Sequence, residues 1–179
     1  PGLPYKYNTE LIYKNDWNRN SNVYGFYASL KENVDPSCSC FRNINPFRAN
    51  SKNRIVIRYA DVLLMRAEAL IELNRSNEAL PLINQVRQRA KQSTSMIPYA
   101  TNADIALYQD GVNITWNQEN ARKALRWERR LEFAMEGSRF FDLVRWGIAD
   151  QVLNDYFTKE KTRRPAIFSS AYFTKNKND

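Results

Sequence analysis

The clearest pattern of apolar and polar positions lies between residues 57 and 74. Apolar side chains recur there at the spacing of one helix face, and charged side chains fall on the opposite stripe, as in an amphipathic helix. The apolar face consists of Tyr59, Leu63, Leu64, Ala67, Leu70 and Ile71, and the charged stripe of Asp61, Glu68, Glu72 and Arg75. The pattern predicts a helix over 57–74.

A second helix is predicted over 77–91, after a turn of only a few residues. Pro81 falls in its first turn, where a proline removes few backbone hydrogen bonds. Its inward side chains are expected to be Ala79, Leu82, Ile83, Val86 and Ala90. Two amphipathic helices joined by so short a turn pack as an antiparallel pair.

This helix pair fits the design of a tetratricopeptide repeat. Small residues at Ala67 and Ala79 let the two helices approach closely, and six positions fit the register of the repeat. The six positions are Leu63, Ala67, Leu70, Ala79, Ile83 and Val86. One such unit cannot stand alone, because its outer faces need neighbours.

The rest of the chain has weaker patterns. A third helix is predicted over 117–136 and a shorter helical segment over 138–146, ended by Gly147. The inward side of the third helix is expected to be Ala124, Trp127, Leu131 and Ala134. Residues 1–56 are expected to be loop-rich with short helical or extended pieces, because asparagine and proline favour turns. Residues 148–179 are expected to form an irregular tail.

The charge of the chain narrows the classes of function. The net charge is +8, but the basic residues are spread out with no run of four or more. A nucleic-acid surface is usually a clustered basic face, so we interpret the charge mainly as a determinant of solubility and keep nucleic-acid binding as a minor alternative. No stretch approaches about 18 consecutive apolar residues, so no membrane-spanning helix is predicted.

Histidine is absent, which excludes His-based triads and the usual zinc sites. We expect no metal site and no cofactor. Cys38 and Cys40 form a C-x-C pair that lacks the two further ligands of a structural zinc site. Their thiols lie too close along an extended chain for an easy disulfide. The sequence leaves the pair either free or unusually bridged.

Glu128, Glu132 and Glu136 recur at every fourth residue of the third predicted helix. One interpretation is a carboxylate pair for glycoside hydrolysis. The other is ion pairing with arginines, in sequence or across to another helix; the nearest arginines are Arg122, Arg126, Arg129 and Arg130. We favour pairing, because catalytic carboxylates normally face each other across a cleft.

The stretch EGSRFFDLVRWG, residues 136–147, sets charges among large apolar side chains. Arg139, Asp142 and Arg145 recur at every third residue, surrounded by Phe140, Phe141, Leu143 and Trp146. A buried charge is tolerated only when it is paired, and nothing in the stretch resembles a nucleophile with its base. We interpret the stretch as a brace, in which the charges pair and the aromatic side chains pack.

Aromatic side chains in the N-terminal part suggest a ligand site. Trp17, Tyr24 and Tyr27 lie in the polar, loop-like sequence NDWNRNSNVYGFY. Flat rings beside asparagine side chains suit sugars, which offer C–H faces and hydroxyl rims. These three residues are the candidates for ligand binding, and the alternative is that they are ordinary core residues.

Two blocks of the sequence together resemble the C-terminal half of SusD/RagB-like proteins. The first is IRYADVLLMRAEALIELNRSNEALPLINQVRQRA, with the family's arginine, Ala-Asp, Ala-Glu-Ala and Asn-Gln-Val-Arg. The second is ERRLEFAMEGSRFFDLVRWG, with its Glu-Arg, Glu-Gly, Arg-Phe-Phe-Asp-Leu and Arg-Trp-Gly. The matching positions form a structural signature, which comprises Arg58, Asp61, Glu68, Glu128, Glu136, Arg139, Asp142, Arg145 and Trp146.

The resemblance implies a fold and a role. Such proteins are almost entirely α-helical, so we expect an all-α, SusD-like fold with tetratricopeptide-like helix pairs and long ordered loops, in a single C-terminal domain over 1–179. They are surface lipoproteins of the outer membrane in Bacteroidetes. They capture glycans, or sometimes peptides, and pass them to a SusC-like TonB-dependent transporter. They are not enzymes.

The sequence departs from the family pattern in ways that limit the inference. The family's N-terminal half and its lipid-bearing cysteine are not in this sequence, and Cys38 and Cys40 are in the wrong place for that anchor. We therefore expect a portion of a longer protein that meets the membrane only through a lipid anchor outside this chain. No ligand residue is carried over, because much of the glycan platform of relatives lies in that half and in variable loops.

Three alternatives to glycan capture remain open. They are a tetratricopeptide adaptor that binds protein segments, a glycoside hydrolase that uses Glu128 or Glu132, and a basic nucleic-acid binder.

Overall fold

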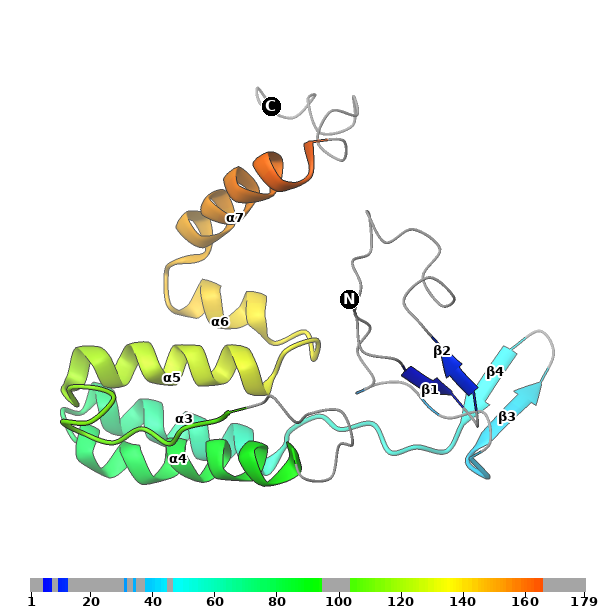
Figure 1. The fold of residues 1–179 in the computed structure, drawn as a ribbon, viewed down its shortest axis with the longest axis horizontal. Coiled ribbons are helices and arrows are strands. Elements are labelled where there is room, and N and C mark those ends of the chain that lie inside the picture. The colour runs from blue at the N-terminus through cyan, green and yellow to red at the C-terminus, as the bar shows by residue number, and fades with distance from the viewer. Residues whose placement is uncertain are drawn as a thin grey trace. The chain divides into compact units, whose positions relative to one another are not determined.

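The computed structural model describes residues 5–7, 10–12, 31, 34, 38–44, 47–94 and 104–165 (Figure 1). The chain divides into two compact units. One unit is Asn53–Arg139, and the other combines Pro1–Lys52 with Phe140–Asp179. The prediction of a single domain over 1–179 stays a prediction.

The unit Asn53–Arg139 is built from three helices that pack against one another, α3 (Tyr59–Glu72), α4 (Ser76–Ser93) and α5 (Gln118–Glu132). Figure 1 shows them side by side, with α4 running back along α3. These helices confirm the three predicted over 57–74, 77–91 and 117–136, with ends that differ by a few residues. The all-α prediction is also confirmed.

The turn between α3 and α4 is set by Asn74. Its φ of 60° lies in the left-handed region, which asparagine tolerates better than most residues. The Asn74 N–H donates to the Ile71 carbonyl at 3.1 Å, and the Arg75 N–H donates to the Leu70 carbonyl at 2.8 Å. This pair of bonds is a Schellman motif, and it ends α3 sharply enough for α4 to begin at Ser76.

The core of this unit confirms the tetratricopeptide register. All six register positions are buried, namely Leu63, Ala67, Leu70, Ala79, Ile83 and Val86. Leu64 and Ile71 widen the buried face of α3, as the pattern predicts. From α5, Ala121, Ala124 and Leu125 close the core. Ala67 of α3 and Ala79 of α4 are fully buried, which agrees with a close approach of the two helices.

The predicted inward face of α5 is wrong at three positions. Trp127 and Leu131 are each 51% exposed, and Ala134 is also exposed. The side of α5 that packs on α3 and α4 instead includes Glu128 and Arg129, which are buried. Both charged side chains have partners on those helices. Tyr59 was also expected inward, but it lies at the start of α3 and is exposed.

Two helices follow Ser138. The first, α6 (Arg139–Arg145), agrees with the predicted segment 138–146. It ends in a second Schellman motif, in which Gly147 has a φ of 67° and the Ile148 N–H donates to the Leu143 carbonyl at 3.0 Å. Phe140 and Phe141, which were expected to pack, are exposed.

The expectation of an irregular tail over 148–179 is wrong for its first half. Residues 149–163 form α7 (Ala149–Arg163). Its charges suit the helix macrodipole, because Asp150 lies in the first turn and Lys161 and Arg163 lie in the last. Glu160 also pairs with Arg164 at 3.4 Å. A basic composition therefore did not make this segment irregular.

Short antiparallel hairpins provide the extended pieces that were expected in residues 1–56. In the first hairpin β1 (Tyr5–Tyr7) pairs with β2 (Glu10–Ile12), and in the second β3 (Phe41–Ile44) pairs with β4 (Phe47–Asn50). The register of the second hairpin sets Phe41 opposite Asn50.

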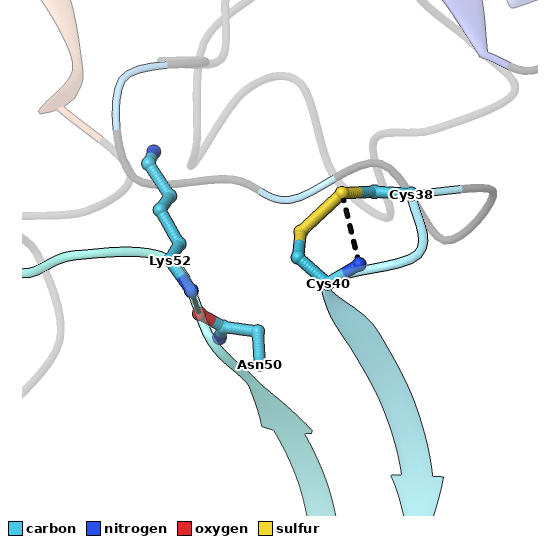
Figure 2. The surroundings of a disulfide bond; sticks show 4 residues. All are labelled: Cys38, Cys40, Asn50 and Lys52. Carbon is cyan, nitrogen blue, oxygen red and sulfur yellow. Dashed lines mark hydrogen bonds between the residues drawn. A yellow bond between two sulfur atoms is a disulfide. The ribbon is translucent and has the colours of Figure 1, made fainter.

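A disulfide joins Cys38 to Cys40 directly before β3 (Figure 2). The Cys40 N–H donates to Cys38 Sγ at 3.2 Å, and the Phe41 N–H closes a turn onto the Cys38 carbonyl at 2.9 Å. This turn brings the two Cα atoms to 5.1 Å, closer than an extended chain would hold them. The sequence left the two cysteines either free or bridged, and in the structure they are bridged.

Candidate functional site

Glu128 and Glu132 of α5, together with Glu136 just after its end, bind two arginines from other elements, Arg87 of α4 and Arg58 before α3. Arg58 precedes α3, and its guanidinium reaches the end of α5. Its Nε donates to Glu136 Oε2 at 3.0 Å, and its Nη2 donates to Glu136 Oε1 at 2.9 Å. Its Nη1 donates to the Glu132 carboxylate, and Nη2 also donates to the Glu132 backbone carbonyl at 3.1 Å. One guanidinium thus binds two carboxylates and a carbonyl at the C-terminal end of the helix.

Phe133 lies beneath this arginine and beneath a second one. The guanidinium carbons of Arg58 and Arg129 lie 4.9 and 5.0 Å from the centroid of its ring. Arg129 in turn donates to Asp61 Oδ1 at 2.8 Å, which ties α5 to α3. Cation–π contacts of partly desolvated arginines add to the ion pairs. The buried ring and its two arginines therefore fix the crossing of α3 and α5.

Arg87 of α4 makes a second set of contacts between elements of this unit. Its Nη1 donates to Glu128 Oε2 at 2.7 Å. Its Nε and Nη2 donate to the Ala106 carbonyl at 2.9 and 2.7 Å. Its guanidinium carbon lies 4.4 Å from the centroid of the Tyr108 ring. One side chain therefore joins α4 both to α5 and to the loop that precedes α5.

The electrostatics of Glu128 follow from its position. Burial raises the pKa of the Glu128 carboxyl above its ordinary value, and the hydrogen bond and charge of Arg87 oppose the shift without cancelling it. For Arg58, burial by itself lowers the pKa, but the bonds to Glu136 and Glu132 outweigh it and raise the pKa. Arg58 therefore remains charged, whereas ionised Glu128 has a desolvation cost.

The loop before α5 is held mainly by side chain to backbone bonds. The Asn84 side chain accepts from the Tyr108 N–H and donates to the Tyr108 carbonyl, both at 2.8 Å, as a neighbouring strand would. The Trp116 Nε1–H donates to the Ser76 carbonyl at 2.9 Å, and the Trp116 N–H donates to Asp110 Oδ1 at 2.7 Å. The described part of this loop, 104–117, is thus attached at both ends to α4.

The opposite end of α5 is tied to the end of α3. Gln118 donates to the Ile71 carbonyl at 2.8 Å, and Arg122 binds both oxygens of Glu72 at 2.7–2.8 Å. The hydrogen bond from Arg122 lowers the pKa of Glu72. Together with the Arg58 contacts, these bonds show that α5 runs antiparallel to α3.

We call the ion pairs of Arg58 and Arg87 with these glutamates the clamp, because they hold the helices of this unit together. Glu128 is buried and hydrogen-bonded to Arg87, while Glu132 and Glu136 bind Arg58, so these carboxylates are engaged by cations. The described part of the chain has no cluster of three histidine, cysteine, aspartate or glutamate side chains that could hold a metal ion. None of its described helices is both long and apolar enough to cross a membrane.

The remaining candidate residues are the three N-terminal aromatic residues, the residues of the brace and Glu68. Trp17, Tyr24 and Tyr27 lie outside the residues that the structure describes. In the brace, buried Asp142 accepts from Arg145 Nε at 2.9 Å, and the Arg145 guanidinium carbon lies 4.9 Å from the Trp146 ring centroid. Arg139 and Glu68 are both half-buried.

Sequence reasoning missed the roles of Asn84, Arg87 and Trp116. A signal for two of them was present, because Asn84 and Arg87 begin and end the Asn-Gln-Val-Arg motif that carries part of the family resemblance. Spaced three residues apart on a helix, they lie on one face and reach the same loop.

Comparison with known proteins agrees with the resemblance. Residues 6–179 match the model of the SusD family. The SusD-like protein P25 of Formosa agariphila is 35% identical over 160 residues, which is 85% of this chain and 28% of that protein. The SusD-like protein P38 of the same organism is 38% identical over 111 residues, 62% of this chain and 20% of that protein. The chain thus spans about a quarter of the length of these curated relatives.

Proposed function

Because this chain belongs to the SusD family, we propose that the full-length protein binds a glycan without catalysis at the surface of the outer membrane and delivers it to a SusC-like TonB-dependent transporter. The observation that carries the proposal is the family match over residues 6–179, which covers nearly the whole chain. A lipid anchor outside this chain would hold the protein at the membrane.

The contacts in the unit Asn53–Arg139 support a scaffolding role for these residues within that function. The positions that resemble the family are engaged in helix packing and in holding a loop, as Arg58, Asn84 and Arg87 illustrate. Binding sites are commonly built on loops that a rigid scaffold positions. We therefore expect the glycan to bind at loops, with Trp17, Tyr24 and Tyr27 as the candidates for stacking on sugar rings.

The direct test is isothermal titration calorimetry of the full-length protein against a broad panel of glycans and peptides. Saturable heat with at least one glycan, with no change in that glycan after long incubation, is the expected result. Heat with peptides alone would replace glycan by peptide as the ligand. Flat titrations against the whole panel would contradict the proposal.

A second candidate is a tetratricopeptide adaptor for protein segments, which the buried register of α3 and α4 favours. The same titrations separate the two, because an adaptor would bind protein segments and show no affinity for sugars. The hydrolase alternative is less well supported, since Glu128 is buried against Arg87. Turnover of a polysaccharide that disappeared in Glu128→Gln would revive it.

A further inference from the structure

The β3–β4 hairpin exposes one face of its two strands. In an antiparallel pair, directly opposite residues lie on the same face, and every second residue along a strand returns to that face. The register therefore sets two pairs on one face, Ile44 with Phe47 and Arg42 with Ala49. All four residues are exposed, and Phe47 is 74% exposed. We call these four residues the hairpin face.

The hairpin face combines an aromatic ring with a cation. Arg42 and Phe47 are diagonal neighbours across the two strands. Such neighbours are about 7–8 Å apart in sheets, within reach of long and aromatic side chains. Among the residues that the structure describes, Arg42 has no acidic partner, unlike Arg58 and Arg87, which bind glutamates. Its guanidinium is therefore available to a ligand.

The sequence around the hairpin is basic throughout. From residue 36 to residue 60 there are five basic residues and no acidic one, namely Arg42, Arg48, Lys52, Arg54 and Arg58. Arg58 is neutralised in the clamp. In the unit Asn53–Arg139, by contrast, thirteen basic residues are accompanied by ten acidic ones. A local excess of positive charge attracts anionic ligands, so the hairpin differs from the helices in the partner that it favours.

The base of the hairpin is held in place before any ligand binds. The Cys38–Cys40 disulfide fixes the turn that leads into β3 (Figure 2). The Ser51 N–H donates to the Cys40 carbonyl at 2.9 Å and extends the pairing by one residue, and Lys52 Nζ donates to the Lys31 carbonyl at 2.7 Å. A two-stranded hairpin on its own is at best marginally stable in water, so these contacts order it. An ordered element loses less entropy when it binds.

We infer that the hairpin face binds an acidic glycan, with Arg42 on the carboxylate of a uronic acid and Phe47 against the C–H face of a sugar ring. A guanidinium matches a carboxylate with two parallel hydrogen bonds. An exposed aromatic ring provides an apolar surface that a sugar ring can cover. The inference rests on the proposed function and narrows its ligand to glycans that carry carboxylates.

The charge of the hairpin face decides between this ligand and two other occupants. A neutral glycan would use Phe47 but would leave Arg42 and the surrounding positive charge without a complement. An apolar cover from another part of the protein would desolvate the Arg42 guanidinium, and a desolvated charge needs a partner of opposite sign. An acidic glycan satisfies both the ring and the cation.

Isothermal titration calorimetry of the full-length protein tests the inference. The ligands are oligogalacturonate, oligoalginate and oligoglucuronate, each also as its neutral methyl ester. We expect at least one acid to bind about tenfold or more tightly than its ester, because a hydrogen bond between charged partners is among the strong ones. Arg42→Gln should abolish this preference, and Arg42→Lys should retain part of it. Phe47→Ala should weaken the binding of acid and ester alike.

The matched controls remove similar groups elsewhere on the surface. Lys91→Gln removes one exposed positive charge from α4, and Val112→Ala removes an exposed apolar side chain from the loop before α5. Neither should change the affinity or the preference for the acid. All variants are to be compared at equal thermal midpoints, so that unfolding does not account for a loss of binding.

The outcomes separate this inference from the proposed function. A neutral glycan that binds while no acid is preferred would overturn the inference and leave the proposed function standing. Flat titrations with every glycan would contradict both. A preference for the acid that persists in Arg42→Gln would place the acidic site elsewhere and would also overturn the inference. Binding of dextran sulfate without binding of any of the three acids would contradict the carboxylate as the recognised group.

Discussion

The guanidinium of Arg58 binds both carboxylate oxygens of Glu136 at 2.9–3.0 Å across a separation of 78 residues. The same group binds Glu132 and contacts the ring of Phe133. Only 21% of the Arg58 side-chain surface is exposed to solvent. Solvent therefore screens these contacts less than it screens those of a surface pair. The relationship joins the start of α3 to the segment that follows α5.

Arg58→Ala should therefore destabilise the protein. Loss of one partner from a buried ion pair costs roughly 3–5 kcal/mol, and we expect about 2–3 kcal/mol here because Arg58 is partly exposed. Arg58→Lys should recover only part of the loss, since an ammonium cannot make the two-pronged contact with Glu136. Urea unfolding measures the free energy, and Arg75→Ala, which removes an exposed pair with Glu78, is the control that should change little. Equal effects of the two alanine variants would contradict the role of Arg58.

A pH dependence follows from Glu128. Its folded pKa is raised above the unfolded value, so the native state holds more protons than the unfolded state between the two values. The stability of the wild type relative to Glu128→Gln should therefore fall as the pH rises through that window, which begins near the ordinary value of 4.5. Unfolding free energies of both proteins between about pH 4 and about pH 7 test this.

Glu119→Gln provides the contrast for the pH experiment. Glu119 is exposed, and the hydrogen bond from Lys123 lowers its pKa. Its contribution has the opposite sign, being present above the unfolded pKa and lost as the pH falls. If both substitutions gave the same slope with pH, the explanation by burial of Glu128 would be wrong.

Asn84→Ala should loosen the loop before α5. The substitution leaves the N–H and the carbonyl of Tyr108 without their side-chain partner, which typically costs about 1–3 kcal/mol. The Tyr108 amide should exchange its hydrogen faster, as measured by hydrogen–deuterium exchange. Asn84→Asp keeps the acceptor and removes the donor, so it should retain part of the protection. Unchanged exchange in Asn84→Ala would show that other contacts hold the loop.

Asp142 and Trp17 give a contrast between framework and ligand site. Asp142→Ala should destabilise the protein by about 1–3 kcal/mol, because a buried partner of Arg145 is removed. Trp17→Ala should leave stability nearly unchanged and weaken glycan binding, if Trp17 stacks on the ligand. Calorimetric titration and urea unfolding of both variants measure the two effects. A stable Asp142→Ala protein that has lost binding would overturn this assignment.

The parts of the fold that the sequence predicts are those where apolar spacing decides the packing. In α3 and α4, residues such as Ala67 and Ile83 occupy the core because their spacing places them on the side of each helix that packs against the other. The short turn at Asn74 makes the pair local in sequence. Spacing rules therefore suffice for this pair, and no distant contact is needed.

The inward face of α5 was beyond such rules. Apolar spacing favours Trp127 and Leu131, but the buried residues include Glu128 and Arg129. Burial of these charges depends on Arg87 and Asp61, which lie 41 and 68 residues away and whose positions are known only from the fold. The contacts of Arg87 with the loop could not be predicted from spacing either, because hydrogen bonds to backbone carbonyls leave no periodic pattern in the sequence.

The separation of Arg58 from Glu136 has a kinetic consequence. Contacts within the α3–α4 pair close short loops, whereas this ion pair closes nearly the whole unit Asn53–Arg139, at a larger entropic cost. Local contacts form first where topology sets the order of events. The helix pair should then form before the clamp, so weakening Arg58 should accelerate unfolding while leaving the folding rate almost unchanged. The clamp would accordingly determine how long this unit stays folded and contribute little to how quickly it folds.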